Sequence, residues 1–264
     1  MSDNQAKKSQ KLPLSIAVIS YNEENIISKM LDSVCDIASE IIIVDSHSTD
    51  NTIAIAQEYG AKVFVEDWKG HIAQKNSALE KCSFPWVLCL DCDEVLSPEL
   101  QASIVDAIKQ DKNKAFSINR KSFYLGKFMK FAWRPDWKLR LVNKALQPRW
   151  KGLDPHDYLN ISNLQSAKRL NGDLLHFSYS GVKEHFAKTI DYAKISALSY
   201  YKSGKKFSLI KLIINPVIAF ARLYLFNFGF LDGTRGFIAA VSSLVGTFLK
   251  YAFLFELELK NSSK

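Results

Sequence analysis

The stretch Trp86-Val-Leu-Cys-Leu-Asp-Cys-Asp-Glu94 places five mostly apolar residues directly before two closely spaced aspartates. A short, continuous apolar run of this kind is typical of a strand that is buried on both faces of a sheet. The acidic residues Asp91, Asp93 and Glu94 then stand where the chain leaves the sheet. The stretch therefore predicts a buried strand that ends in a group of carboxylates.

Upstream of this strand, short apolar runs alternate with segments of helical periodicity. Strands are predicted at 15–19, 40–44 and 61–65, and helices at 22–34, from near Asp50 to Gly60, and at 71–81. Downstream, Ser97-Pro98-Glu99 has the N-cap, N1 proline and acidic first turn of another helix. This β-α-β-α order predicts an α/β fold with a mostly parallel, Rossmann-like central sheet flanked by helices.

Two other predicted strands also run into polar residues. Ser20-Tyr-Asn-Glu-Glu24 follows the first strand, and Asp45-Ser-His-Ser48 follows the second. Parallel sheets bind their ligands at the carboxyl ends of the strands, so we expect the three polar clusters to form one site. No Gly-x-Gly-x-x-Gly and no P-loop motif follows any strand, which disfavours dinucleotide oxidoreductases and P-loop enzymes.

The residue types at these strand ends indicate the chemistry. Asp91 and Asp93 could reach one hard cation, Mg²⁺ or Mn²⁺, which together with a diphosphate would complete an oxygen ligand set. Alone, an Asp-x-Asp pattern is common on loops. Asp45 could accept hydrogen bonds from a base or ribose, whereas Asp50 and Asn22 also suit helix N-caps. Lys75 could meet a phosphate or be solvated.

Together these clusters resemble the inverting family 2 glycosyltransferases of the GT-A fold. The stretches that carry the resemblance are 19–24, 44–52, 70–76 and 90–100. The chain is more closely similar to the β-glucosyltransferases of lipopolysaccharide inner-core assembly, through 123–126, 136–141, 156–157, 175–179, 229–233 and 248–251. The resemblance covers almost the whole chain, although other cell-envelope transferases share the later motifs.

The resemblance implies a role for each matching residue of the donor site. Ser20, Asn22 and Glu24 would line the nucleotide pocket, Asp45 would bind uracil or ribose, and Lys75 would lie near the diphosphate. Asp93 would be the main metal ligand, Asp91 would lie near the ribose or the metal, and Lys138 and Arg140 would face phosphate. Stacking on the neighbouring tryptophans competes with that last role. His176 would be an additional metal ligand, although its position also suits a hydrogen-bonded histidine at a strand end.

An inverting transfer needs a general base for the acceptor hydroxyl. The resemblance places this base at Asp157, in the turn-like stretch Gly152-Leu-Asp-Pro-His-Asp157, where the subgroup commonly has Glu. Asp154 and Asp136 are substitutes, and a plain turn carboxylate is the alternative for Asp157.

The last sixty residues differ in composition. Segments 209–230 and 237–255 are strongly apolar, but Lys211, Arg222 and Lys250 interrupt them and Pro216 is expected to kink the first. Polar residues share a narrow stripe on each segment, which suits helices that lie in a membrane surface. A hairpin buried against the domain and a spanning hairpin are the alternatives. We therefore expect a disordered tail at 1–11, a GT-A catalytic domain at 12–204 and a membrane-associated helical region at 205–264.

Charge and cysteine content indicate the binding partners and the cellular compartment. The net charge of +8 suggests an anionic partner, but the basic residues are dispersed, which gives nucleic acid little support. Cys89 and Cys92 lack the further ligands of a zinc site, so the four cysteines are expected to be reduced, structural thiols in the cytosol. The N-terminal segment has no apolar signal core. We expect a peripheral or monotopic protein on the cytoplasmic face of the inner membrane.

The expected reaction is transfer of a hexose, glucose from UDP-glucose, onto a membrane glycolipid such as the lipopolysaccharide inner core. Two alternatives stay open. The acceptor could be a polyprenyl-phosphate or a capsule or exopolysaccharide intermediate. The chain could also be a catalytically silent, membrane-docked scaffold that binds nucleotide sugars, although its intact aspartates argue against this.

Overall fold

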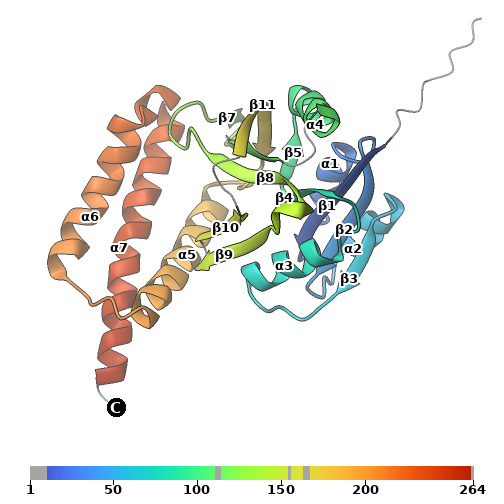
Figure 1. The fold of residues 1–264 in the computed structure, drawn as a ribbon. Helices are drawn as coiled ribbons and strands as arrows, with labels where there is room; N and C mark the ends of the chain where they lie inside the picture. Colours follow the sequence, from blue (N-terminus) through green and yellow to red (C-terminus); the bar gives the residue numbers. More distant parts are fainter. Residues whose placement is uncertain (1–10, 111–113, 154–155, 163–166, 263–264) are drawn as a thin grey trace, which may run out of the picture. The chain divides into compact units, whose positions relative to one another are not determined.

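The computed structural model describes residues 11–110, 114–153, 156–162 and 167–262 (Figure 1). They form two compact units. The first comprises Met1–Asn119, Trp137–Lys151 and Tyr158–Leu174, and the second comprises Arg120–Asp136, Gly152–Asp157 and Leu175–Lys264. The predicted catalytic domain at 12–204 thus contains segments of both units, including the helix at 182–202.

The first unit is built on a sheet whose parallel part matches the predicted strands. β1 (Leu12–Ser20), β2 (Ala38–Asp45), β3 (Lys62–Val65) and β4 (Trp86–Asp91) lie in the order β3-β2-β1-β4, with every pairing parallel. The sheet continues through β8 (Trp137–Asn143), β6 (Ala115–Tyr124), β11 (Ala167–His176) and β5 (Glu94–Leu96). β8 is antiparallel to both β4 and β6. The sheet is therefore parallel from β3 to β4 and antiparallel where β8 joins β4 to β6.

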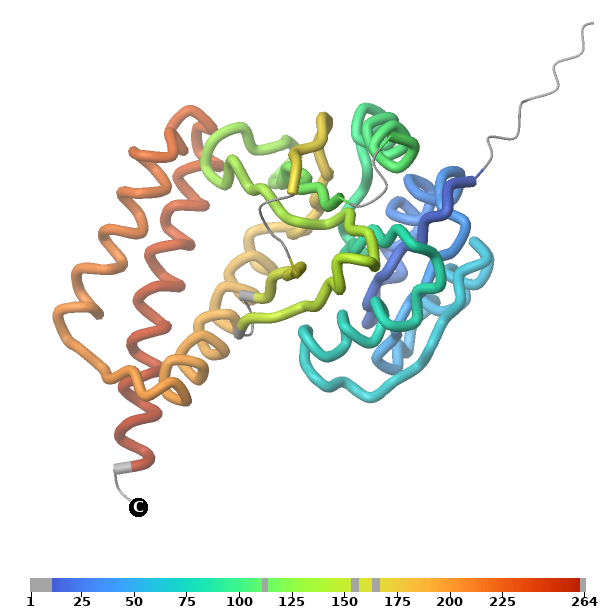
Figure 2. The backbone as a smooth tube through the Cα atoms, in the orientation of Figure 1, coloured from blue at the N-terminus to red at the C-terminus, as the bar shows by residue number. Residues whose placement is uncertain are grey.

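The helices of this unit are α1 (Ile27–Asp32), α2 (Thr52–Glu58), α3 (His71–Lys81) and α4 (Pro98–Gln110). Alternate residues of β1 point to opposite faces of the sheet, so Ile16 and Val18 pack with α1, α2 and α4, whereas Ala17 packs with α3. The chain trace shows these helices distributed around the sheet (Figure 2). The prediction of an α/β fold with flanking helices is confirmed.

One predicted helix start is wrong. The helix predicted from Asn22 begins only at Ile27, and Asn22 has a positive φ of 55° instead of capping it. Its side-chain oxygen accepts hydrogen bonds from the backbone and hydroxyl of Thr49, so tertiary contacts hold it in the left-handed region that asparagine tolerates. Asp50 is not the N-cap either: α2 is preceded by Asn51 at that position, although Oδ1 of Asp50 accepts the backbone N–H of Thr52.

A small two-stranded sheet, β9 (Arg149–Leu153) and β10 (His156–Asn160), contains the region around the predicted base. Asp154 lies outside the described residues. Trp150 and Leu159 of these strands are buried in the same cluster as Ala78 and Leu79 of α3. This cluster anchors the hairpin to the first unit.

The second unit is mainly helical. Its helices are α5 (Val182–Lys202), α6 (Leu209–Ala221) and α7 (Thr234–Ser262). It also contains a π-helical turn at Arg222–Phe226, a 3-10 turn at Gly229–Asp232 and the short strand β7 (Lys127–Phe128). α7 packs against both α5 and α6. A Cβ at Gly236 would collide with the carbonyl oxygen of Gly229, so the tight turn into α7 requires a residue without a side chain.

The C-terminal helices are more continuous than the sequence suggests. α6 runs through Pro216, and both Leu209–Phe226 and Thr234–Asn261 are long and apolar enough to cross a membrane by length and composition. Only 6% of Leu209–Phe226 is buried, compared with 28% of the second segment. α6 therefore exposes most of its apolar surface.

Candidate active site

The carboxylate of Asp91, the last residue of β4, lies between two cations. Lys75 of α3 places its Nζ 3.1 Å from Oδ1, and Arg140 of β8 places Nη2 3.0 Å from Oδ2. The same Nη2 donates to Oε1 of Glu94 at 2.7 Å, and Oε2 of Glu94 accepts the backbone N–H of Asp91. A helix and a strand that are distant in sequence thus converge on one carboxylate at the end of a parallel strand.

Arg140 is deeply buried in this network, with only 4% of its side chain exposed, and Glu94 is fully buried. Burial alone would lower the pKa of Arg140, but the carboxylates of Glu94 and Asp91 raise it above its usual value. The prediction that Arg140 faces a phosphate is therefore not what this arrangement offers directly, because such a contact would require the guanidinium to leave two carboxylates. Lys138, two residues earlier on β8, is half-buried and pairs with Ile118 of β6.

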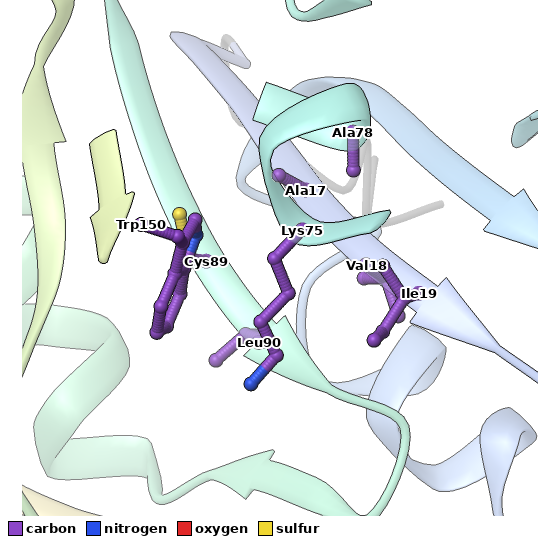
Figure 3. A pocket seen from close by; sticks show the side chains of 8 residues that line it. All are labelled: Ala17, Val18, Ile19, Lys75, Ala78, Cys89, Leu90 and Trp150. Atoms are coloured by element: carbon purple, nitrogen blue, oxygen red, sulfur yellow. The ribbon is translucent and has the colours of Figure 1, made fainter. Parts of the chain in front are cut away.

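Lys75 emerges from α3 toward the strand end and lies over the ring of Trp150, with its Nζ 4.5 Å from the ring centroid (Figure 3). Arg140 lies against the same ring, at 5.5 Å. The pocket between Lys75, Trp150 and Cys89 has about 10 Å³ of space, which suits one water molecule. Trp150 thus fixes the position of both cations that flank Asp91.

Asp45, at the end of β2, is fully buried and bonded within the protein. Oδ2 accepts hydrogen bonds from the hydroxyls of Ser20 and Ser48, both at 2.6 Å, and Oδ1 accepts the backbone N–H of Ser48 at 2.7 Å. A direct contact of Asp45 with a base or ribose would have to replace one of these bonds. In this arrangement Asp45 ties the ends of β1 and β2 together.

The two turns that follow β1 and β2 are interlocked by similar bonds. Oε2 of Glu24 accepts two hydrogen bonds from Asn51, and Oδ2 of Asp50 accepts the backbone N–H of Glu24. The backbone N–H of Asn22 donates to Ser48. The structure therefore brings together the predicted residues Ser20, Asn22, Glu24 and Asp45 and uses their polar groups to hold the strand-end turns in place.

Asp93 stands in the turn between β4 and β5. Cys92 is buried, with its Sγ 3.3 Å from the carbonyl oxygen of Ile19, whereas Asp91 and Asp93 on either side of it are partly exposed. Within the described ranges, no group of three or more His, Cys, Asp and Glu side chains could hold a metal ion. The pair of Asp91 and Asp93 fits Mg²⁺ or a similar ion, which is usually held by one or two carboxylates together with substrate phosphates and water.

The remaining predicted residues belong to the second unit. Asp157 is the second residue of β10 and is half-buried. His176 ends β11 and is hydrogen-bonded through Nδ1 to the hydroxyl of Ser178, at 2.6 Å. Asp136, the substitute base, forms an ion pair with Nε of Arg120 at 2.8 Å.

Comparison with known proteins identifies the family. The family described as "Glycosyl transferase family 2" matches residues 15–161, which is more than half of the chain. The chain belongs to glycosyltransferase family 2. It is 33% identical to an uncharacterised glycosyltransferase of Rickettsia typhi, over 94% of this chain and 88% of the relative. It is also 32% identical to the lipopolysaccharide core biosynthesis glycosyltransferase LpsC of Rhizobium meliloti, over 93% of both chains.

A solved structure gives the same fold. The mannosyltransferase PcManGT from Pyrobaculum calidifontis, in complex with GDP-Man and Mn²⁺, covers 96% of this chain and 88% of its own, with a TM-score of 0.52 and 14% identity. At that identity the likeness shows the fold alone. This family 2 glycosyltransferase accordingly has the predicted GT-A architecture.

Sequence reasoning about this glycosyltransferase missed Glu94 and Trp150 as members of the site. Glu94 directly follows the Asp-x-Asp pair in sequence. The structure shows that it is fully buried, and a buried acid requires a cationic partner. Trp150 lies 59 residues beyond Asp91 in sequence. No local pattern connects it with Lys75.

Proposed function

We propose that this glycosyltransferase moves a hexose, glucose from UDP-glucose, onto a membrane glycolipid of the lipopolysaccharide core type, with inversion at the anomeric carbon. The observation that carries the proposal is the carboxylate pair at the end of β4. Asp91 is held by Lys75 and Arg140, and Asp93 stands two residues further on in the turn. The 32% identity to LpsC over 93% of the chain supports the acceptor class.

The donor would bind across the ends of β1, β2 and β4. Lys75 is already beside a carboxylate, so an incoming diphosphate would compete with Asp91 for its ammonium group. The turns of Ser20–Glu24 and Asp45–Asn51, fixed by their mutual hydrogen bonds, would form the walls of the nucleotide pocket. Because these walls are already fixed, less conformational entropy would be lost when the donor binds.

Asp93 would hold the metal, with Asp91 beside it and diphosphate oxygens completing the ligand set. The Mn²⁺ of the PcManGT complex supports a divalent ion. A bound Mg²⁺ or Mn²⁺ supplies neutralisation of the charge that develops on a departing nucleoside diphosphate. His176 belongs to the second unit and is hydrogen-bonded to Ser178, which favours its alternative as a satisfied histidine at a strand end.

Asp157 would remove the proton of the acceptor hydroxyl as that oxygen attacks the anomeric carbon from the face opposite the leaving group. One carboxylate is enough for this step, because the leaving diphosphate needs no proton when its charge is neutralised. Asp136 is a weaker candidate, because its carboxylate is already paired with Arg120.

Association with the cytoplasmic face of the inner membrane would bring the enzyme to a lipid-linked acceptor. The support is the exposed apolar surface of α6, on which Ile210, Ile213 and Val217 are 69%, 61% and 59% exposed. Such surface is unusual for a soluble protein and is typical of a membrane or partner contact.

The proposal is tested by mass spectrometry of the purified protein with a panel of UDP-sugars and Mn²⁺ or Mg²⁺. We expect UDP-glucose to be hydrolysed slowly without acceptor and transferred in the presence of a core glycolipid. Transfer only to polyprenyl phosphates or capsule intermediates would replace the acceptor class. Binding of UDP-sugars without hydrolysis or transfer of any of them would favour the scaffold alternative.

A further inference from the structure

The second unit contains a pocket of about 380 Å³ that is separate from the residues assigned to the donor. All of its lining residues belong to that unit, and they come from β6, from the loop 129–136, from the segment after β11 and from the π-helical turn after α6. Among its described lining residues, the charged ones are Arg134, Arg120 and Asp136, with Nε of Arg120 paired to Asp136 at 2.8 Å, and His176 adds an imidazole. A pocket of this volume accommodates a sugar ring with its substituents.

The wall of this pocket is firmly built. The carboxylate of Asp232 accepts the backbone N–H groups of Lys130, Phe131 and Ala132, at 2.9, 2.9 and 2.8 Å. These three bonds fix the loop that presents Trp133 and Arg134. Charge-assisted bonds of this kind are among the stronger hydrogen bonds in proteins.

A buried aromatic cluster supports the same wall from behind. His185 is buried and its Nδ1 lies 2.8 Å from the hydroxyl of Tyr124, while the ring of Trp133 lies 5.4 Å from Tyr124 and 6.0 Å from Tyr179. Trp133 and Tyr179 also line the pocket. Aromatic rings that are fixed in this way offer flat apolar faces against which the C–H face of a sugar can pack.

The other side of the pocket is next to apolar surface. Leu223 and Asn227 line the pocket from the turn after α6, and their neighbours Leu225 and Phe226 are 53% and 75% exposed. A ligand in the pocket would therefore have its polar part among arginines and aromatic rings, and an apolar part could continue along α6. This combination fits an amphiphilic molecule with an anionic, sugar-bearing headgroup.

We propose that this pocket binds an acidic sugar of the acceptor, one that carries a carboxylate or a phosphate group, with Arg134 as its anion-binding residue. The planar guanidinium group suits both anions because it can donate two parallel hydrogen bonds. The inference rests on the proposed function and deepens it, since it specifies the chemical class of acceptor that the enzyme selects.

The test uses the full chain with its donor site saturated by UDP and Mn²⁺, and saturation-transfer NMR detects the probes. The probes are methyl β-glucuronide, glucose 6-phosphate and, as the neutral comparison, methyl β-glucoside. We expect at least one acidic probe to bind markedly tighter than the glucoside. The better of the two acidic probes identifies the anion as carboxylate or phosphate. Equal binding of all three, or no binding, would overturn the proposal.

Three variants locate the binding. Arg134→Gln is expected to weaken the acidic probe about tenfold, because a charge-assisted bond is lost, while Arg134→Lys recovers part of the affinity. Lys202→Gln removes the same charge from an exposed position at the end of α5 and is expected to bind as the unmodified protein does. Wild-type affinity in Arg134→Gln would exclude this pocket.

A further variant controls for misfolding and separates the acceptor pocket from the proposed function. Asn227→Trp fills part of the pocket without removing a charge, and we expect it to block the acidic probe as well. Hydrolysis of UDP-glucose should persist in all these variants, because no donor residue is changed. Persistent hydrolysis without probe binding overturns the acceptor pocket alone, whereas loss of donor hydrolysis in the unmodified protein would count against the proposed function.

Discussion

Nη2 of Arg140 lies 3.0 Å from Oδ2 of Asp91, although the two residues are 49 positions apart in the chain. The contact forms because β8 is antiparallel to β4, with Leu141 opposite Leu88. Arg140 therefore lies beside the last residues of β4. Arg140 therefore acts as a positioning residue: it fixes the carboxylate that follows the buried strand and balances the buried charge of Glu94.

Replacing Arg140 with Met should strongly destabilise the fold. Breaking a buried ion pair by removing one partner leaves an uncompensated charge, which costs roughly 3–5 kcal/mol. Chemical unfolding followed by circular dichroism measures the loss. Arg149→Met, which removes the exposed ion pair with Glu80, is the control and should cost at most about 1 kcal/mol. Adding Glu94→Leu to Arg140→Met should restore part of the stability, and no recovery would show that Glu94 is not the uncompensated group.

Asp93→Asn should abolish most metal-dependent turnover of the donor. Neutralisation by a bound cation contributes several kcal/mol to such a transition state, so we expect the rate to fall roughly a hundredfold or more. Hydrolysis of UDP-glucose at increasing Mn²⁺ measures the effect, and EDTA should reproduce it in the unmodified enzyme. Asp106→Asn, an exposed change on α4, serves as the control. Full activity in Asp93→Asn would show that the metal is held elsewhere.

Asp157→Asn should stop transfer while the donor still binds. General bases contribute typically 10²–10⁴-fold, so transfer should fall by about that factor with the affinity for UDP-glucose nearly unchanged. Isothermal calorimetry of donor binding and a transfer assay separate the two effects. Asp157→Glu should retain part of the activity, because the carboxylate is kept. If Asp157→Asn also loses donor binding, the residue serves the donor and not the acceptor.

The stability of the protein should fall as the solution is acidified, in part through Glu40. Burial raises the pKa of this carboxyl, but hydrogen bonds from Ser15, Ser83 and Lys62 outweigh it and lower the pKa from 4.5 to about 2. A lowered pKa in the folded state stabilises the fold above pH 4.5, and this contribution disappears as the pH falls toward 2. The drop corresponds to roughly 3 kcal/mol.

The variant Glu40→Gln tests this dependence through unfolding free energies measured between pH 5 and pH 2. We expect the variant to be less stable at neutral pH and to lose less stability on acidification than the unmodified protein. Glu58→Gln, at the exposed end of α2, should leave the pH profile unchanged. An identical profile in Glu40→Gln would mean that the hydrogen bonds to Glu40 persist when it is uncharged.

Binding to lipid vesicles should depend on α6. Ile210→Glu together with Ile213→Glu places two charges on its exposed apolar side and should reduce co-sedimentation with anionic vesicles about tenfold or more, since burial of each isoleucine is worth about 1.5–3 kcal/mol. Val65→Glu, a change of an exposed apolar residue on β3, should bind as before. Unchanged sedimentation of the double variant would place the membrane contact elsewhere or exclude it.

Local sequence patterns were sufficient for the parallel half of the sheet. Helix α3 begins at His71 and ends at Lys81, as predicted, and the apolar runs at 15–19, 40–44 and 86–90 became β1, β2 and β4. These elements are recognisable because buried parallel strands are apolar throughout and their helices carry a 3.6-residue period. The helix at Val182–Lys202 was not among the predicted elements. It packs on α7, with Ala197 buried against Tyr251 and Leu254, a contact that only the fold reveals.

The sequence by itself therefore determined the fold class, the family and the positions of Asp45, Asp91 and Asp93 at strand ends, because each depends on residues that are neighbours along the chain. Only the tertiary structure decided what these carboxylates contact. Lys75 reaches Asp91 from a helix, and Arg140 reaches it from a later strand that pairs antiparallel with β4. Trp150 lies against both cations, and no local signature predicts any of these contacts. Electrostatic partners are fixed by distance in space, which sequence separation does not encode.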